Sequence, residues 1–310
     1  MTTTIYTHPD CLQHQPGRGH PEAPARLEAV LAALASPEFA AAARVSAPLG
    51  TLEQIARVHD DAYIEAVRAA APREGHRTLD AGDTVMSPGT WNAVLRCVGA
   101  ACAAVDAVVA GEARNAFCAT RPCGHHAEAD RAMGFCVFNQ AAIAALHARA
   151  VHGLQRVAVI DFDVHHGNGT QSSFWDDPDL FYGSSHQSPF YPGTGARRES
   201  GVAGNIVNIP LARGADSAAF RRGMTDELLP ALARFAPELV IVSAGFDAHH
   251  LDPLGGLAFT DDDFHWITRE LMAVADASAK GRVVSTLEGG YSLEGLAGGS
   301  AAHVRALMAP

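Results

Sequence analysis

Two acidic and two imidazole side chains directly follow a short apolar run in the segment VAVIDFDVHHGNGTQ, residues 157–171. The apolar run predicts a buried strand that ends at Asp161. Moving a carboxylate into an apolar interior is costly unless the carboxylate is paired or binds a metal. The pattern therefore predicts a cation beside Asp161 and Asp163.

The spacing of these side chains favours a metal site. In an extended segment residues two apart point to the same side, so Asp161, Asp163 and His165 share one face. Asp247, at the end of the apolar run ELVIVSAGFD, is the best candidate for a ligand from another strand. Three protein ligands leave a position for water, as in a catalytic zinc site, and carboxylate ligands also suit iron(II) or manganese(II). The neighbouring histidines diverge on a strand and are expected to be supporting or surface groups: His166, His249 and His250.

Helical and β-rich segments alternate along most of the chain. Ala-rich segments with helical patterning lie at about 24–35, 89–110, 139–152, 217–235 and 261–279. The β-rich runs lie at 115–120, 156–161, 180–186, 205–211, 238–247 and 281–291. Strands that are apolar throughout and alternate with helices predict a parallel sheet covered on both faces. Because neither a repeat nor a Ser/Pro-rich linker divides the chain, we expect one domain over residues 1–310.

Polar clusters follow four of the predicted strands. Their sequences are RPCGHHA, DFDVHHGNGTQ, FDAHHLDPLGG and EGGY. One such cluster alone is more often a solvated strand end than a site. In a parallel sheet, however, functional groups gather at the carboxyl ends of the strands. Four clusters in matching positions therefore predict a single crevice.

Composition excludes several classes of partner. The formal charge is −11, and Lys280 is the only lysine, so a nucleic acid is not expected to bind. No apolar run of about 18 residues escapes interruption by charge or glycine, which argues against a membrane span. The six cysteines form no CxxC pair, and MTTTIYTHPD lacks the features of a signal peptide. We expect a cytoplasmic protein, and the sequence predicts no oligomeric state.

Five ordered motifs carry a family resemblance: GHPEAPARL, RPCGHHA, DFDVHHGNGTQ, SAGFDAHHLDPLGG and LEGGY. Together they resemble the zinc-dependent histone deacetylase superfamily. The likeness is to its class II and bacterial histone deacetylase-like amidohydrolase branch, which is related to the acetylpolyamine amidohydrolases. It runs from about His8 to Tyr291. It implies the arginase/deacetylase fold, a single α/β domain with a central parallel sheet of about eight strands and helices on both faces. It also implies a zinc-dependent amidohydrolase that removes acetyl or related acyl groups.

The resemblance also implies roles for individual residues. Asp163, His165 and Asp247 match the metal ligands, as the spacing alone suggested. His126 matches the general base of the tandem histidines. The other catalytic matches are His125, Asp161, which orients His125, Asn168, which pairs with His126, and Tyr291, which binds the substrate carbonyl. A structural potassium ion is expected at Asp161, Asp163, His165 and Ser184.

Further matches concern the substrate channel and product release. Phe135 is expected in a narrow apolar channel for an acyl-lysine-like chain, facing Tyr191. Asp83 is expected to contact a peptide backbone. Arg26 is expected near the internal end, where acetate leaves. Cys123 departs from the pattern, because the class II branch usually has proline there. Its thiol could be oxidised and its redox role stays open, but we expect a buried and inert thiol.

The sequence can be compared with three alternative functions. An arginase-like binuclear manganese enzyme needs a further aspartate where His166 and Gly167 stand. A non-catalytic metal-binding or acyl-binding module would be expected to lack Tyr291 or one histidine of the pair. An acetylpolyamine or other small-molecule deacetylase stays open. The polyamine branch has glutamate where this chain has Leu254, which favours acyl-lysine substrates, although an acid such as Asp252 or Glu199 could still attract a polyamine.

Overall fold

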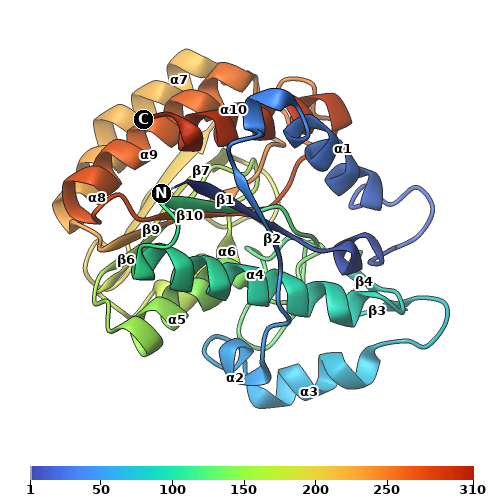
Figure 1. Ribbon diagram of the computed structural model, residues 1–310. Coiled ribbons are helices and arrows are strands. Elements are labelled where there is room, and N and C mark those ends of the chain that lie inside the picture. The colour runs from blue at the N-terminus through green and yellow to red at the C-terminus, as the bar shows by residue number, and fades with distance from the viewer. Residues whose placement is uncertain (1) are drawn as a thin grey trace.

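The computed structural model describes residues 2–310, which form one parallel eight-stranded sheet covered on both faces by helices (Figure 1). The order of the strands is β2-β1-β5-β10-β9-β6-β7-β8. Their bounds are β1 Thr3–Thr7, β2 Ala43–Ser46, β5 Asn115–Cys118, β6 Val157–Asp161, β7 Leu180–Gln187, β8 Ile206–Leu211, β9 Leu239–Ala244 and β10 Val283–Leu287. Two further strands of two residues each, β3 Arg77–Thr78 and β4 Val85–Met86, pair antiparallel in a separate sheet. The predicted parallel sheet of about eight strands with helices on both faces is thereby confirmed.

The helices divide into two layers. Their bounds are α1 Pro24–Leu34, α2 Leu52–Ile55, α3 Asp61–Ala70, α4 Thr90–Ala110, α5 Gln140–His152, α6 Asn168–Phe174, α7 Ser217–Gly223, α8 Leu229–Phe235, α9 Asp261–Ser278 and α10 Leu293–Met308. Helices α1 and α7 to α10 lie on one side of the sheet, and α4 and α5 lie on the other (Figure 1). Short turns of 3-10 helix occupy Pro9–Leu12 and Pro37–Phe39.

Alternation along the strands explains why the sheet has two cores. In β9, Val240 and Val242 join the core under α9 and α10, whereas Leu239 and Ile241 join the core under α4 and α5. Successive side chains of a strand point to opposite faces, so a sheet covered on both faces needs apolar residues at every position. This requirement produced the uninterrupted apolar runs that the sequence displays.

Six of the eight strands coincide with the predicted β-rich runs. The prediction omitted β1 and β2, at one edge of the sheet, and β2 has the exposed sequence ARVS instead of an apolar run. It also omitted four helices, α2, α3, α6 and α10. The three glycines of α10 weaken its helical pattern. The predicted helix at 217–235 is divided by a π-helical turn, Met224–Leu228, between α7 and α8.

Helix α4 is long and apolar enough to cross a membrane, by length and composition alone. It is the one such helix among residues 2–310, and 67% of its apolar window is buried within the protein. Its residues Ala100, Ala104 and Val105 belong to the core shared with α5 and the sheet. These contacts are those of a core helix.

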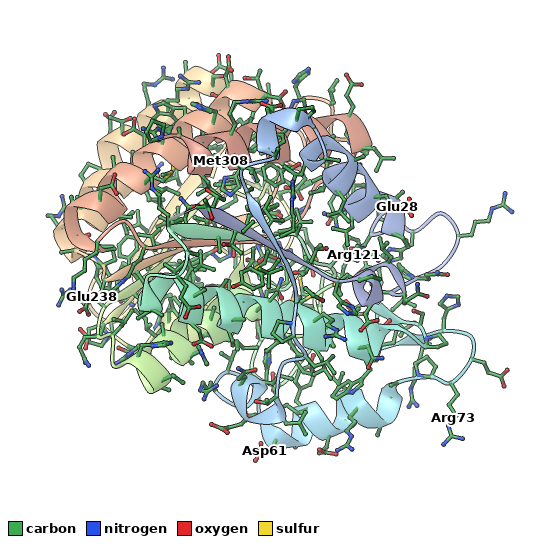
Figure 2. The ribbon with its side chains drawn as sticks, in the orientation of Figure 1. Glu28, Asp61, Arg73, Arg121, Glu238 and Met308 are labelled. Atoms are coloured by element: carbon green, nitrogen blue, oxygen red, sulfur yellow. The ribbon has the colours of Figure 1, made fainter. Side chains whose placement is uncertain are left out.

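A buried ionic cluster attaches the segment before α1 to the sheet. The Glu22 carboxylate accepts hydrogen bonds from Arg121 Nε at 2.9 Å and Arg26 Nη1 at 2.9 Å, and His14 Nε2 lies 3.0 Å away. Arg121 also donates to the carbonyl oxygen of Cys11 at 2.8 Å. Figure 2 shows Arg121 in the interior, where it is 0% exposed. Burial alone would raise the pKa of Glu22, but the charge of Arg121 and the hydrogen bond from His14 hold that pKa well below its ordinary value.

Replacing Glu22 with Gln should lower the free energy of unfolding near pH 7 by about 3–5 kcal/mol, because two buried guanidinium groups lose their counter-charge. The folded-state pKa of Glu22 is depressed, so its stabilisation is complete above the unfolded pKa of about 4.3 and is lost as pH falls toward the folded value. The difference between wild type and E22Q should therefore narrow below about pH 4. Urea unfolding at several pH values measures it.

Glu65→Gln is the matched control, because Glu65 makes only an exposed pair with Arg68 and its loss should change stability little. Equal stability of E22Q and wild type at pH 7 would contradict the assigned role of the cluster.

Candidate active site

The four predicted polar clusters meet because their strands are neighbours. β5, β10, β9 and β6 are consecutive in the centre of the sheet, and all of them are parallel. Their carboxyl ends therefore lie along one edge, where the loops after them converge. The sequence predicted the clusters, and the order of the strands brings them together.

Asp163, His165 and Asp247 form a compact group of candidate metal ligands. Their ligand atoms all lie within 4.8 Å of one another. His165 Nδ1 is 3.0 Å from Asp163 Oδ1 and 3.3 Å from Asp247 Oδ2. Both carboxylates are 0% exposed. One nitrogen and two carboxylate oxygens converging on one point form a donor set for a divalent cation.

The hydrogen bonds around these carboxylates leave one oxygen to be satisfied. Asp163 Oδ2 accepts from Gly289 N at 2.8 Å, and Asp247 Oδ1 accepts from Val164 N at 2.8 Å. Asp247 Oδ2 is buried and has no hydrogen-bond partner among the described residues. Because an unsatisfied buried carboxylate oxygen is costly, this atom fits the place of a metal ligand.

The same oxygens explain a glycine after β10. A Cβ atom at Gly289 would collide with Asp247 Oδ2 and would lie 2.5 Å from Asp163 Oδ2. Only a residue without a side chain lets the backbone approach both carboxylates. The glycine of LEGGY is therefore a steric requirement of the ligand group.

The charges of the group oppose one another strongly. Burial, together with the charge of Asp163, raises the pKa of Asp247 to about 7. Burial alone would lower the pKa of His165, but its hydrogen bond to Asp163 and the nearby charge of Asp247 raise that pKa to about 10. Two buried carboxylates thus favour a positive charge between them.

His126 is held in one tautomer by a chain of side-chain hydrogen bonds. Its Nδ1 is 2.9 Å from Asn168 Oδ1, and Asn168 Nδ2 donates to Glu128 Oε1 at 2.6 Å. Since the Glu128 carboxylate only accepts, the amide oxygen of Asn168 faces His126, and His126 Nδ1 must carry the proton. Nε2 is then an unprotonated base. Burial and the charge of His125 hold the pKa of His126 well below its ordinary value.

His125 has the opposite environment. Its Nδ1 lies 2.9 Å from Asp161 Oδ2, and its Nε2 lies 3.9 Å from Asp163 Oδ1. Burial opposes the charged form, but these two carboxylates raise the pKa of His125 well above its ordinary value. Tyr182 also donates to Asp161 Oδ2 at 3.0 Å. The two adjacent imidazoles, whose centroids are 4.0 Å apart, are therefore a base and a charged donor.

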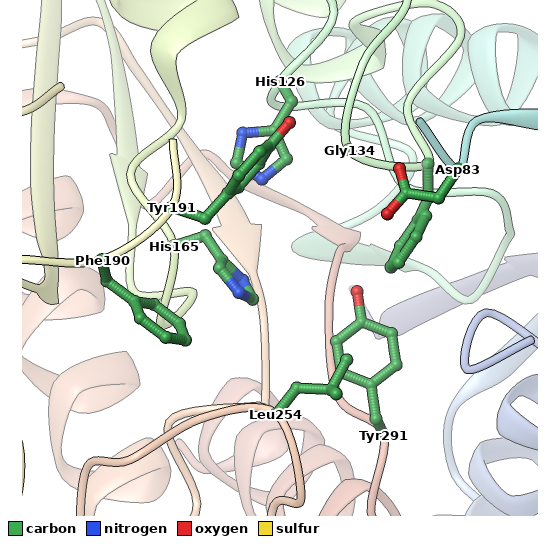
Figure 3. Close-up of a pocket in the computed structure, with 9 residues that line it drawn as sticks. Asp83, His126, Gly134, His165, Phe190, Tyr191, Leu254 and Tyr291 are labelled. Atoms are coloured by element: carbon green, nitrogen blue, oxygen red, sulfur yellow. The ribbon is translucent and has the colours of Figure 1, made fainter. Parts of the chain in front are cut away.

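A cavity of about 220 Å³ opens above this group (Figure 3). It is lined by Asp83, His126, Gly134, Phe135, His165, Phe190, Tyr191, Leu254 and Tyr291. All four predicted channel residues are among them. Figure 3 shows the Tyr291 hydroxyl directed into the space that His126 and His165 also face.

The sequence did not indicate the aromatic wall contributed by Phe190. Its ring stacks on the His165 imidazole with centroids 5.1 Å apart and planes at 15°. Tyr191, the next residue, makes an edge contact with His126 at 5.1 Å. The aromatic pair in SPFYPG was a usable signal, but the loop that carries it has no periodic pattern.

Arg26 lies behind Tyr291 and is 1% exposed. Its Nε donates to Gly290 O at 2.5 Å and its Nη2 to Glu288 O at 2.6 Å, while its guanidinium carbon is 4.9 Å from the centre of the Tyr291 ring. These bonds attach α1 to the turn that carries Tyr291. The expected role of Arg26 in acetate release stays a prediction.

Two of the four residues predicted to bind potassium, Asp163 and His165, belong to the ligand group. The other two are Asp161 and Ser184. Ser184 of β7 is in register with Asp161 of β6, and its Oγ lies 2.9 Å from His186 Nδ1. Asp161 Oδ1 accepts from Asp163 N at 3.1 Å. The strand register thus brings Asp161 and Ser184 side by side, and potassium binding stays a prediction.

Two further carboxylates, Glu288 and Asp252, organise the loops. The sequence did not predict this role for either of them. Glu288 is 0% exposed and accepts from Gly124 N at 2.7 Å and His125 N at 3.3 Å. Asp252 accepts from Tyr291 N at 2.7 Å and from Leu254 N at 2.9 Å. Both hold backbone segments that carry site residues. A carboxylate in LEGGY or LDPLGG is a signal for such a role, but its partner lies far away in sequence.

The neighbouring histidines, which were expected to be supporting or surface groups, bind elsewhere. His166 lies 2.8 Å from Thr194 Oγ1 and 3.0 Å from Gln171 Oε1. His249 Nε2 lies 3.4 Å from Asp261, and His250 Nδ1 lies 3.1 Å from a backbone carbonyl oxygen. In the described chain none of them belongs to the ligand group.

Comparison with known proteins identifies relatives of the whole chain. Residues 20–307 match the histone deacetylase domain family. Histone deacetylase 14, chloroplastic, of Arabidopsis thaliana is 39% identical over 98% of this chain and 76% of its own length. The histone deacetylase-like amidohydrolase of Pseudomonas aeruginosa is 41% identical over 80% of this chain and 66% of its own length. The crystal structure of the HDA15 HD domain superposes with a TM-score of 0.93 and 32% identity, covering 99% of this chain and 88% of that one.

We expect the purified Asp247→Ala protein to lose most of its bound divalent metal, because Asp247 supplies the one buried carboxylate oxygen left without a hydrogen bond in the described chain. Elemental analysis of the protein after dialysis measures the metal. The control is Asp83→Asn, which alters the same cavity away from the ligand group and should keep a full equivalent. Full metal occupancy in the D247A protein would contradict the ligand assignment.

Proposed function

The chain belongs to the histone deacetylase family, and we propose that it removes acetyl or related acyl groups from acyl-lysine-type amides. Membership makes it a deacetylase, a hydrolase of amide C–N bonds. The observation that supports this substrate class is the cavity. Its apolar side chains lead to the ligand group, to the imidazole of His126 and to the phenol of Tyr291.

We further propose zinc as the metal, held by Asp163, His165 and Asp247, with iron(II) and manganese(II) as chemical alternatives. A divalent ion there would supply a Lewis acid that polarises the amide carbonyl and makes water more acidic. A structural potassium ion beside Asp161 and Ser184 is part of the same proposal.

His126 is the proposed general base. Its Nδ1 proton is directed to Asn168, which leaves Nε2 unprotonated on the side of the cavity. Nε2 takes a proton as water attacks the amide, and the same atom then gives a proton to the leaving amine. His125, held by Asp161, keeps a positive charge beside the reacting atoms.

Tyr291 is the proposed donor to the oxyanion that develops on the substrate. The hydrogen bond from its backbone N–H to Asp252 and the contact of its ring with Arg26 fix the direction of its phenol. A hydroxyl held in place before the reaction stabilises the developing charge without reorganisation. Its ring also makes an edge contact with Phe135, at 5.9 Å between centroids.

The rim of the cavity supports acyl-lysine over acetylpolyamine as substrate. Leu254 lines the cavity and is 38% exposed, so this position offers no charge to a second ammonium group. The two acids named from sequence as possible attractors of a polyamine, Asp252 and Glu199, are already hydrogen-bonded within the protein. Asp252 is bound by backbone amides, and Glu199 accepts from Gln171 Nε2 at 2.8 Å and Gly195 N at 3.0 Å. Asp83 is the one acid among the described residues that line the cavity.

Replacing Tyr291 with Phe should lower kcat on an acetyl-lysine peptide by roughly 10²–10³-fold, the usual cost of one oxyanion donor. Metal content should stay at the wild-type level, because the hydroxyl lies outside the ligand group. Steady-state kinetics and elemental analysis of the same preparation test both points. Unchanged turnover would show that the hydroxyl does not act on the substrate.

Replacing Leu254 with Glu should move selectivity toward acetylated polyamines. A charge pair about 4 Å apart contributes about 1 kcal/mol in water and about 4 kcal/mol at a partly buried rim. The measurement is the ratio of kcat/KM for an acetyl-lysine peptide to that for acetylspermidine, in the parent protein and in L254E. Leu254→Gln controls for size and polarity. A parent enzyme that already prefers acetylspermidine by tenfold would replace the acyl-lysine proposal with the small-molecule one.

A further inference from the structure

Two thiols lie in contact beside the cavity. Cys123 Sγ is 3.3 Å from Cys136 Sγ, and the two residues are 3% and 0% exposed. Both sulfurs also approach the carbonyl oxygen of Gly134, at 3.8 Å and 3.4 Å. The six cysteines of the described chain are all free. The pair was not foreseen from sequence, where Cys123 was expected to be an inert thiol.

We propose that Cys123 and Cys136 are a modification site, at which a hydroperoxide-class oxidant forms a reversible disulfide that lowers turnover. The effect on turnover rests on the proposed deacetylase function, whereas formation of the disulfide does not. The first cysteine of this site stands where the class II branch, which this chain resembles, usually has proline.

The short distance between the sulfurs makes the bond geometrically accessible. A disulfide has an S–S length of about 2.05 Å, so the sulfurs must approach by a little over 1 Å from their present separation. Cys123 lies in the loop between β5 and His125, and Cys136 follows Phe135. Loops accept such a displacement more easily than the strands of the central sheet.

The reaction balances with the oxidant alone. The sulfur of Cys123 attacks one oxygen of the O–O bond and becomes a sulfenic acid. Its S–H proton goes to the leaving oxygen, which departs as an alcohol, or as water when the oxidant is hydrogen peroxide. Cys136 then loses its S–H proton as its sulfur displaces the hydroxyl group, which leaves as water. Two thiols and one hydroperoxide thus give one disulfide, one alcohol and one water, and two electrons pass from sulfur to oxygen.

The order of the two steps follows from burial. Cys123 retains the small exposure of the pair, so it meets the oxidant first. Burial raises the pKa of the Cys136 thiol well above its ordinary value, so Cys136 does not compete for the oxidant. Its reaction with Cys123 depends on the 3.3 Å distance between the sulfurs. Low exposure also means that oxidation is slow and needs excess oxidant.

The bond would displace both walls of the active site. Cys123 precedes Gly124 and His125, whose amides are held by Glu288 at 2.7 Å and 3.3 Å. Cys136 follows Gly134 and Phe135, and a Cβ at Gly134 would lie 2.5 Å from His126 Cδ2, so this backbone packs directly on the base. Disulfide formation also removes the two S–H donors from Gly134 O. Movement of His126 by a fraction of an ångström is enough to impair catalysis.

The experiment treats zinc-loaded protein with excess hydrogen peroxide, since zinc itself is not oxidised. We expect tenfold or greater loss of kcat, recovery after a phosphine reductant, and a cross-linked peptide pair containing Cys123 and Cys136. Cys123→Ala and Cys136→Ala should each retain activity under the same treatment. Cys118→Ala, which removes a buried thiol in β5, should be inactivated like the parent.

Each outcome is decisive. Loss of activity in C123A equal to that of the parent would overturn the proposal, as would a fully cross-linked enzyme with unchanged kcat. Absence of the cross-linked peptide after prolonged treatment would overturn it as well. Peptide mapping does not depend on turnover, so a protein that lacks deacetylase activity but forms the disulfide would contradict the proposed function and not the modification site.

Discussion

Buried negative charge at the carboxyl ends of three adjacent strands, β10, β9 and β6, is the constraint on which the structure depends. Four carboxylates there are 0% exposed: Asp161, Asp163, Asp247 and Glu288. The imidazoles of His125 and His165 and several backbone N–H groups offset part of this charge. What they leave is a buried oxygen of Asp247 without a hydrogen bond, which fits the place of a metal ligand. The chemistry of the site and its cost in stability therefore have the same origin.

The loops around the site are shaped by what those carboxylates accept. Glu288 fixes the loop of the tandem histidines, and Asp252 fixes both the turn of Tyr291 and the position of Leu254. Neither group needs to touch a substrate to act. Because each carboxylate binds backbone amides, it sets the direction of neighbouring side chains at little cost in side-chain freedom.

A second buried ionic cluster, formed by Glu22, Arg26 and Arg121, contacts the loop that carries Glu288 and Tyr291. Glu22 binds Arg26 and Arg121, and Arg26 in turn binds the carbonyl oxygens of Glu288 and Gly290. The segment before α1 is thereby attached to the loop after β10, at the opposite end of the chain. Residues from near both termini must be in place before Tyr291 can point into the cavity.

Sequence patterns were enough to predict the parallel sheet, six of its strands and the ligand group, because each rests on local period, composition or a contiguous motif. The roles of the two histidines came from the family resemblance. Spacing within DFDVHH placed two ligands on one face, and Asp247 followed from the rule for strand ends. Features that depend on contacts between distant segments became known only from the folded chain. They include the Phe190 wall, the edge strands β1 and β2, and the contact between Cys123 and Cys136. These features have no local pattern, since the partners are chosen by packing.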